Sequence, residues 1–129
     1  MAKYELSLKA DFDKFVAFVK DGVLRRSSTV SLEEESRITT GNVRIYAAAY
    51  ERYAFVGKNR SSLNVTFVGC GEIVHLIGFG TGGSSAMFFK VNTWSEEAFL
   101  DTLIEAAEEY MRERGIEPLY TNLDDAQDE

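Results

Sequence analysis

Hydrophobic and polar residues alternate over the first ten positions and then change to a helical spacing. Tyr4, Leu6 and Leu8 alternate with polar residues, which predicts a half-buried strand. Asp11 offers an N-cap for a helix that ends near Arg25, whose charge suits the negative end of the helix dipole. The apolar positions of this helix are Phe12, Phe15, Val16, Val19 and Val23.

The chain from Thr29 to Asn92 is rich in strand signals. Alternating segments are found at 30–33, 43–52, 63–67, 73–79 and 86–91, with turn signals at 39–42, 57–60 and 69–71. Short connections predict antiparallel hairpins, because parallel strands need long crossovers. Residues 78–85 are expected to form a loop, and Ala86–Val91 a sixth strand.

A second helix is predicted after Ser95, which is placed as its N-cap. Trp94 and Phe99 fit a hydrophobic staple, Gly115 is placed as the C-cap and Pro118 follows as a stop. The apolar face of this helix carries Phe99, Leu100, Leu103, Ile104, Ala106, Ala107, Tyr110 and Met111. Acidic residues occupy the opposite face.

The predicted order over residues 3–114 is one strand, one helix, five strands and a long helix. This order resembles the helix-grip and TBP-like topologies, in which a curved antiparallel sheet cradles a long C-terminal helix. The resemblance implies a small apolar ligand site between that helix and the sheet. We expect an α+β fold with a six-stranded antiparallel sheet and two helices packed on one face. Residues 1–116 are expected to form a single domain, and 117–129 an acidic, disordered tail.

The composition narrows the class of protein. The chain has 129 residues, of which 45% are hydrophobic and 27% charged, so collagen, a disulfide scaffold and a wholly disordered chain are excluded. Its single cysteine, Cys70, can form no intrachain disulfide. We find neither a signal-peptide core nor a membrane-spanning stretch, and we therefore expect a cytoplasmic protein without a membrane partner.

The net charge of -7 is unevenly distributed. Residues 1–65 hold 11 Lys/Arg and 8 Asp/Glu, whereas residues 66–129 hold 3 and 13. This division is typical of an acidic helix face with a solubilising tail, or of subunits that pair head to tail. Nucleic-acid binding is not expected from an acidic chain, although the first half carries Arg25, Arg26, Arg37, Arg44 and Arg52.

A glycine-rich segment is the first candidate for a ligand site. Gly78–Gly83 matches the G-x-G-x-x-G spacing, but a strand rather than a helix is predicted after it, which excludes a dinucleotide-binding unit. The segment is either a flexible hairpin loop or a backbone nest for an anion. The residues that would bind an anion or phosphate are Gly80, Gly82, Gly83, Ser84 and Ser85, together with His75.

His75, the only histidine, and Cys70 lie close in the sequence. They would face each other if 69–72 is a turn, and a Cys/His pair could then act as nucleophile and base. No signature for such a pair is present, so no catalytic residue is assigned. One histidine with one cysteine makes no ordinary zinc site, and we expect neither a metal nor a cofactor.

The third predicted strand offers a candidate interface. Arg44, Tyr46, Tyr50 and Arg52 share one of its faces, and Tyr and Arg are enriched in protein interfaces. If Val43 and Ile45 face the helices, these four residues point outward, and in the opposite phase they face the helices instead. Three acidic residues precede this strand, and alternation places Glu34 on the same face as Val30 and Leu32.

These patterns predict a small non-enzymatic protein that self-associates, with a dimer favoured, and that binds a small ligand between the last helix and the sheet. The alternative is an anion-binding protein or an enzyme that uses the loop 78–85 with His75.

Overall fold

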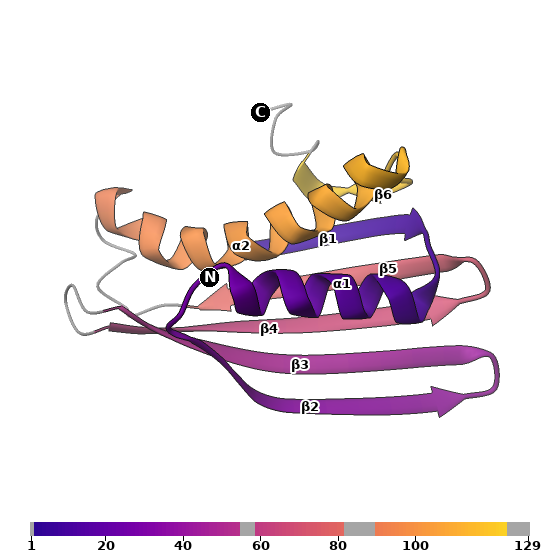
Figure 1. Ribbon diagram of the computed structural model, residues 1–129, viewed down its shortest axis with the longest axis horizontal. Coiled ribbons are helices and arrows are strands. Elements are labelled where there is room, and N and C mark those ends of the chain that lie inside the picture. The colour runs from indigo at the N-terminus through magenta and orange to yellow at the C-terminus, as the bar shows by residue number, and fades with distance from the viewer. Residues whose placement is uncertain (1, 55–58, 82–89, 124–129) are drawn as a thin grey trace.

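One sheet lies under two helices (Figure 1). A computed structural model describes residues 2–54, 59–81 and 90–123, with only the backbone for 54, 59 and 90–98. The elements are β1 (Ala2–Lys9), α1 (Phe12–Arg25), β2 (Val30–Thr40), β3 (Val43–Ala54), β4 (Asn59–Cys70), β5 (Ile73–Thr81), α2 (Lys90–Arg114) and β6 (Tyr120–Thr121).

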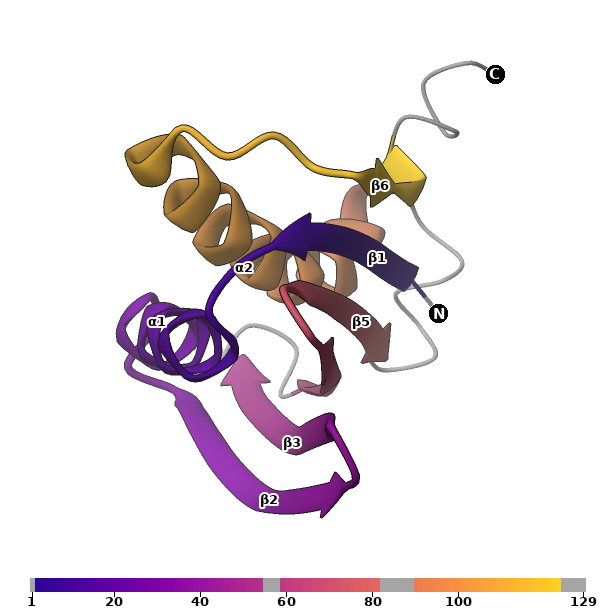
Figure 2. The same cartoon turned by 90° about the vertical axis from the view of Figure 1, so that its right-hand side faces the viewer.

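The strands lie in the order β2-β3-β4-β5-β1-β6, and all neighbours are antiparallel. Figure 2 shows both helices on the same side of the curved sheet. The predicted class, an α+β fold with a six-stranded antiparallel sheet and two helices, is therefore confirmed.

The first strand and helix form as their sequence pattern predicts. Alternation buries Tyr4, Leu6 and Leu8 of β1 beneath the helices. The Asp11 carboxylate accepts a hydrogen bond from the backbone N–H of Lys14 at 2.9 Å, which satisfies one free donor at the start of α1.

Two glycine turns set the register of the central strands. Thr40 pairs with Val43 across one two-residue turn, and Cys70 pairs with Ile73 across the other. Gly41 and Gly71 have φ angles of 59° and 61°, which a residue with a Cβ adopts only at a cost.

Phe15 of α1 occupies the centre of the core. Its ring packs edge-on against Phe67 of β4 and Tyr110 of α2, with centroid distances of 5.5 and 4.8 Å. It therefore joins both helices to the sheet, and its truncation to Ala should cost about 3–5 kcal/mol.

The second helix begins earlier than predicted. It starts at Lys90, so Ser95 lies inside it rather than at its cap, and the proposed staple of Trp94 with Phe99 is wrong. A serine cap contributes only about 1 kcal/mol, too little to stop a helix that packs well downstream. Lys90 and Val91 are helical and not part of a sixth strand, and residues 86–89 lie outside the described residues. The predicted end is confirmed, with Gly115 at a φ of 64° after Arg114.

The sixth strand comes instead from the segment expected to be a disordered tail. Tyr120 and Thr121 pair with Ser7 and Leu6, and the N–H of Leu119 donates to the carbonyl of Ser7 at 2.7 Å. The outer edge of β1 offers unpaired backbone groups, and these bind the segment as a neighbouring strand. Residues 124–129 lie outside the described residues.

The expected loop at 78–85 is also partly strand. Gly78–Thr81 belong to β5, where Gly78 pairs with Tyr4 and Gly80 with Ala2. Glycine-rich sequence is typical of a loop, but Gly78 lies within the strand and allows α2 to approach it closely.

Candidate interaction surface

The face of β3 that carries Tyr46 and Tyr50 points toward the helices, whereas an outward interface needs it to point away from them. Tyr46 and Tyr50 are buried, with 0% and 2% exposed surface, and face the helices. Their cross-strand partners on β4 are Phe67 and Leu63, which belong to the core. Because residues opposite each other in neighbouring strands share a face, the tyrosines must follow their partners inward.

The two arginines of this strand are held on the same side as the tyrosines. Arg44 binds the carboxylate of Asp13 on α1 through two nitrogens, at 3.0 and 2.5 Å. The guanidinium of Arg52 lies 4.8 Å from the ring centroid of Phe99. The prediction of Arg44, Tyr46, Tyr50 and Arg52 as an outward interface is therefore wrong.

A polar cluster joins β2, β3 and α1 beside these tyrosines. The Tyr46 hydroxyl donates to Glu35 at 2.6 Å, and the Lys20 ammonium donates to the same oxygen at 3.0 Å. Burial and this hydrogen bond raise the pKa of Tyr46, whereas the Tyr46 and Lys20 hydrogen bonds lower the pKa of Glu35. The cluster fixes the edge strand β2 to the core.

A bulge reverses the predicted phase of the acidic run. Leu32 pairs with Tyr50, but Glu34 pairs with Ala49, so the register shifts by one residue between them. Leu32 therefore faces the helices while Glu34 faces away from them, and the expectation that these two share a face is wrong. One extra residue in a bulge changes which face the rest of the strand presents.

The sheet face that points away from both helices is the candidate interaction surface. We call it the open face. It consists of Glu34, Ser36, Ile38 and Thr40 of β2; Val43, Ile45, Ala47 and Ala49 of β3; Asn64, Thr66, Val68 and Cys70 of β4; Ile73, His75, Ile77 and Phe79 of β5; and Lys3, Glu5, Ser7 and Lys9 of β1.

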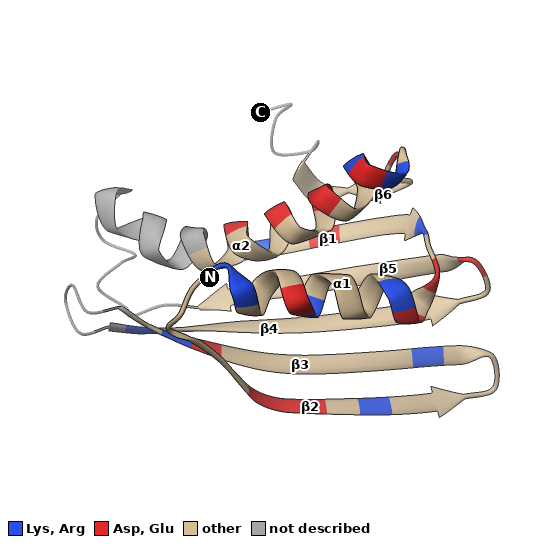
Figure 3. Cartoon of the chain, in the orientation of Figure 1, with Lys and Arg blue, Asp and Glu red and all other residues tan. Residues whose placement is uncertain are grey.

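The centre of the open face is mostly apolar, although it includes Asn64, Thr66 and His75. Its charges lie on the outer strands and, as Glu51, toward one end of β3. None of the four residues named above on each of β3, β4 and β5 is charged, and Figure 3 shows long uncharged stretches of β4 and β5. Ile38 is 57% exposed and Phe79 39% exposed. Large apolar side chains grouped on an uncovered sheet face are typical of an interaction site.

The open face also has a depression, which we call the alanine hollow. It has a volume of about 270 Å³ and is lined by Glu34–Ser36, Ala47–Ala49 and Asn64–Thr66. It exists because Ala47 and Ala49 are small while the residues around them are larger. This hollow was not predicted from the sequence. The pairing of Tyr46 with Phe67 would have indicated that Ala47 and Ala49 face away from the helices.

His75 lies on the open face but not beside Cys70. Register places His75 opposite Ser7 and Val68, whereas Cys70 is opposite Ile73. The Ser7 hydroxyl and the His75 Nδ1 are 2.7 Å apart. Within residues 2–54, 59–81 and 90–123, no carboxylate bonds to this imidazole, so the Ser7–His75 pair lacks the third group of a nucleophilic site. The same residues include no group of three potential metal ligands.

The predicted anion site is only partly described. Gly80 is buried on the helix side of β5, whereas His75 is on the open face, so these two do not line one site. Gly82, Gly83, Ser84 and Ser85 lie outside the described residues.

The described part of α2 packs directly on β5. A Cβ on Gly78 would collide with Leu103, and Phe99 and Leu103 are fully buried. The space above this glycine is therefore filled by α2 itself. No helix in the described chain is both long and apolar enough to cross a membrane.

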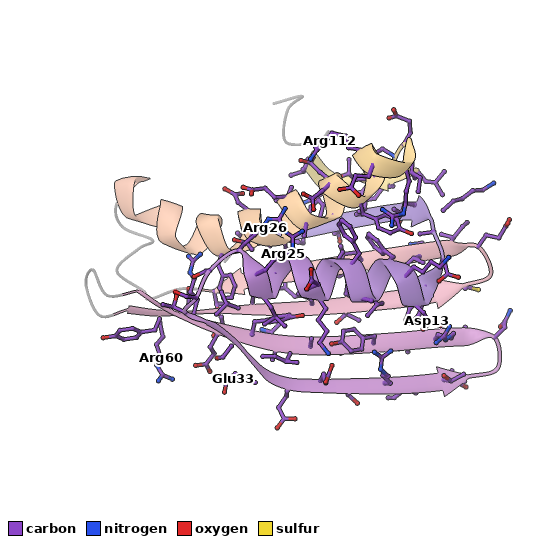
Figure 4. The ribbon with its side chains drawn as sticks, viewed as in Figure 1. Asp13, Arg25, Arg26, Glu33, Arg60 and Arg112 are labelled. Carbon is purple, nitrogen blue, oxygen red and sulfur yellow. The ribbon has the colours of Figure 1, made fainter. Side chains whose placement is uncertain are left out.

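The basic end of α1 is paired with the acidic face of α2. Arg25 donates to Glu109 at 2.9 Å, and Arg26 lies 3.5 Å from Glu109 and 3.7 Å from Glu105. Figure 4 shows both arginines at the end of α1, next to α2. Part of the charge division that suggested head-to-tail subunits is thus satisfied within one chain.

A second hollow, of about 520 Å³, lies where β1 turns into α1. Its walls carry charges of both signs, from Lys9, Arg44, Asp11 and Glu72. Arg44 is already bound to Asp13, and the carboxylate of Asp11 caps α1. The hollow therefore does not offer two free cations to an anion.

Fold and surface together define a small α+β protein with helices on one sheet face and an open, apolar-centred second face. Residues 1–111 match the model of the "Family of unknown function (DUF6054)", and the chain belongs to this family. No curated protein shows significant similarity to it.

Proposed function

We propose that this protein functions by self-association, and that two copies pack their open faces together. The observation that carries the proposal is the apolar centre of the open face, which no described helix covers, with Ile38 57% exposed at its edge. Burying such residues against a second copy removes apolar surface from water.

The size of the open face supports a second copy as its occupant. Each of the five strands contributes four residues to the open face, and because these are alternate residues they extend over about eight residues of strand. At the usual strand spacing and rise per residue, the face measures about 25 Å by 25 Å, or about 600 Å² per copy. Two copies would bury about 1,200 Å², which reaches the range of specific interfaces. Aligned packing of two sheets is a common solution for faces of this kind.

A binding role is better supported than catalysis. The Ser7–His75 pair lies on a flat sheet face, and in the described chain it has no carboxylate partner. A reducing compartment such as the cytoplasm fits an exposed, free Cys70.

Sedimentation velocity tests the proposal. We expect a dimer at micromolar concentration and a monomer after Ile38→Lys, because the substitution puts a charge into the interface. Leu119→Lys is a matched control, since Leu119 is also 57% exposed but lies outside the open face. A strict monomer at high micromolar concentration would contradict the proposal, and so would equal effects of the two substitutions.

A further inference from the structure

The open face has a symmetry that selects one arrangement of two copies. Its rows run across five of the six strands, β2, β3, β4, β5 and β1, and β4 is the middle one of these five; β6 adds only two residues beyond β1. A twofold axis along β4 would exchange β3 with β5 and β2 with β1. We infer that the two copies pack about this axis, with β5 of each copy on β3 of its partner. The inference rests on the proposed self-association.

The size of the side chains supports this axis. One row reads Ser36, Ala47, Thr66, Ile77 and Glu5, and the next reads Glu34, Ala49, Asn64, Phe79 and Lys3. Exchange of β3 with β5 places Ile77 over Ala47 and Phe79 over Ala49. The large residues of one copy therefore fill the alanine hollow of the other, as close packing of a dry interface requires.

The charges at the rim are complementary about the same axis. The row that ends in Glu34 on β2 ends in Lys3 on β1, so Lys3 of each copy meets Glu34 of its partner. An axis along β3 or β5 would not exchange the two outer strands and would lose this match. Complementary rim charges fix the register of an interface more than they add affinity.

The two remaining rows contribute apolar contacts. Exchange places Ile45 against His75 and Val43 against Ile73, while Val68 and Cys70 meet their own copies near the axis. Aligned sheets cross at about 30°, so the correspondence is closest in the two middle rows. Thr66 and Val68 are the residues of β4 in those rows and should lie nearest to their counterparts.

Thiol crosslinking in a Cys70→Ser background tests the axis. With a short bifunctional thiol reagent, Thr66→Cys should link to itself, whereas Ala47→Cys and Ile77→Cys should each stay largely unlinked. A mixture of the Ala47→Cys and Ile77→Cys chains should link again. Sedimentation velocity of each variant before the reagent is added establishes whether a dimer is present.

A charge exchange gives a second measurement. Lys3→Glu should weaken dimerisation about ten-fold by placing like charges together, and the added Glu34→Lys should restore it. A dimer in which Ala47→Cys links to itself as well as Thr66→Cys does would overturn the axis and leave self-association standing. The absence of any dimer would overturn both.

Discussion

Gly22 of α1 lies directly against Ala106 of α2, and a Cβ on Gly22 would lie 2.8 Å from the Cβ of Ala106. A methyl group added at Gly22 would therefore force the helices apart. In an exposed helix Gly→Ala stabilises by about 1 kcal/mol. We expect Gly22→Ala to destabilise this protein by about 1–2 kcal/mol instead, as measured by urea unfolding, because overpacking outweighs helix propensity.

The double variant Gly22→Ala/Ala106→Gly is the control for this contact. It moves the methyl group from one helix to the other and leaves the helix propensities balanced. Its stability should lie within about 0.5 kcal/mol of the original protein. If Gly22→Ala alone is as stable as the original protein, the helices do not depend on this close approach.

The arginine pairs between the helices should make a modest contribution that depends on salt. Glu109 is 24% exposed and Arg26 19% exposed, so their attraction is partly shielded from water. Glu109→Gln should lower the free energy of unfolding by up to about 1 kcal/mol at low salt, and by less in concentrated salt. Glu108→Gln, at an exposed position next to it, should have a smaller effect at both ionic strengths.

Stability should fall at alkaline pH because of buried tyrosines. Burial, with a smaller effect of Glu35, raises the pKa of Tyr50 from 10.0 to about 12. Between these values the unfolded chain releases a proton that the folded chain keeps. This stabilisation, of about 2 kcal/mol, is therefore complete below pH 10 and is lost as the pH rises toward 12.

Tyr50→Phe isolates this effect. The variant should lose less stability between pH 9 and pH 11 than the original protein does, as measured by urea unfolding at each pH. Parallel curves for the two proteins would show that another group causes the alkaline loss.

The C-terminal segment should protect the edge of β1. The Asn122 side chain accepts from the N–H of Glu5 at 2.7 Å and donates to the carbonyl of Lys3 at 3.0 Å, in the manner of a neighbouring strand. Asn122→Ala should speed hydrogen exchange of the Glu5 amide about ten-fold, since one backbone donor loses its partner. The Leu6 amide serves as the internal reference.

Truncation provides a coarser check of the same edge. A chain that ends at residue 116 should aggregate faster than one that ends at 123, because only the first exposes the β1 edge. Equal aggregation of the two chains would mean that β6 offers no protection.

Much of the fold was predictable from local pattern. The alternation of Tyr4, Leu6 and Leu8 and the Asp11 cap each depend on near neighbours, and both predictions are confirmed. The start of α2 was not predictable in this way, because Ser95 suits a cap equally well whether or not a helix continues before it. β6 was missed because its backbone pairs with the edge of β1, a partner that the local sequence around Tyr120 does not reveal.

The candidate surface was predicted on β3, but from the residues of its helix-facing side. Alternation in β3 gives two apolar-bearing faces, one with Tyr46 and Tyr50 and the other with Ile45 and Ala47. Their relative burial depends on Phe67 of the neighbouring strand, which is information that a single strand does not contain. The alanine hollow arises from residues of three strands and has no local signal.

The register shift between Leu32 and Glu34 divides β2 into two halves of opposite phase. The first half supplies Leu32 to the core side, and the second supplies Ile38 to the open face. A deletion at Glu33 would remove the offset and turn one half over, so that either the core or the open face would lose its residues. The length of the chain is therefore constrained at this point as tightly as its composition.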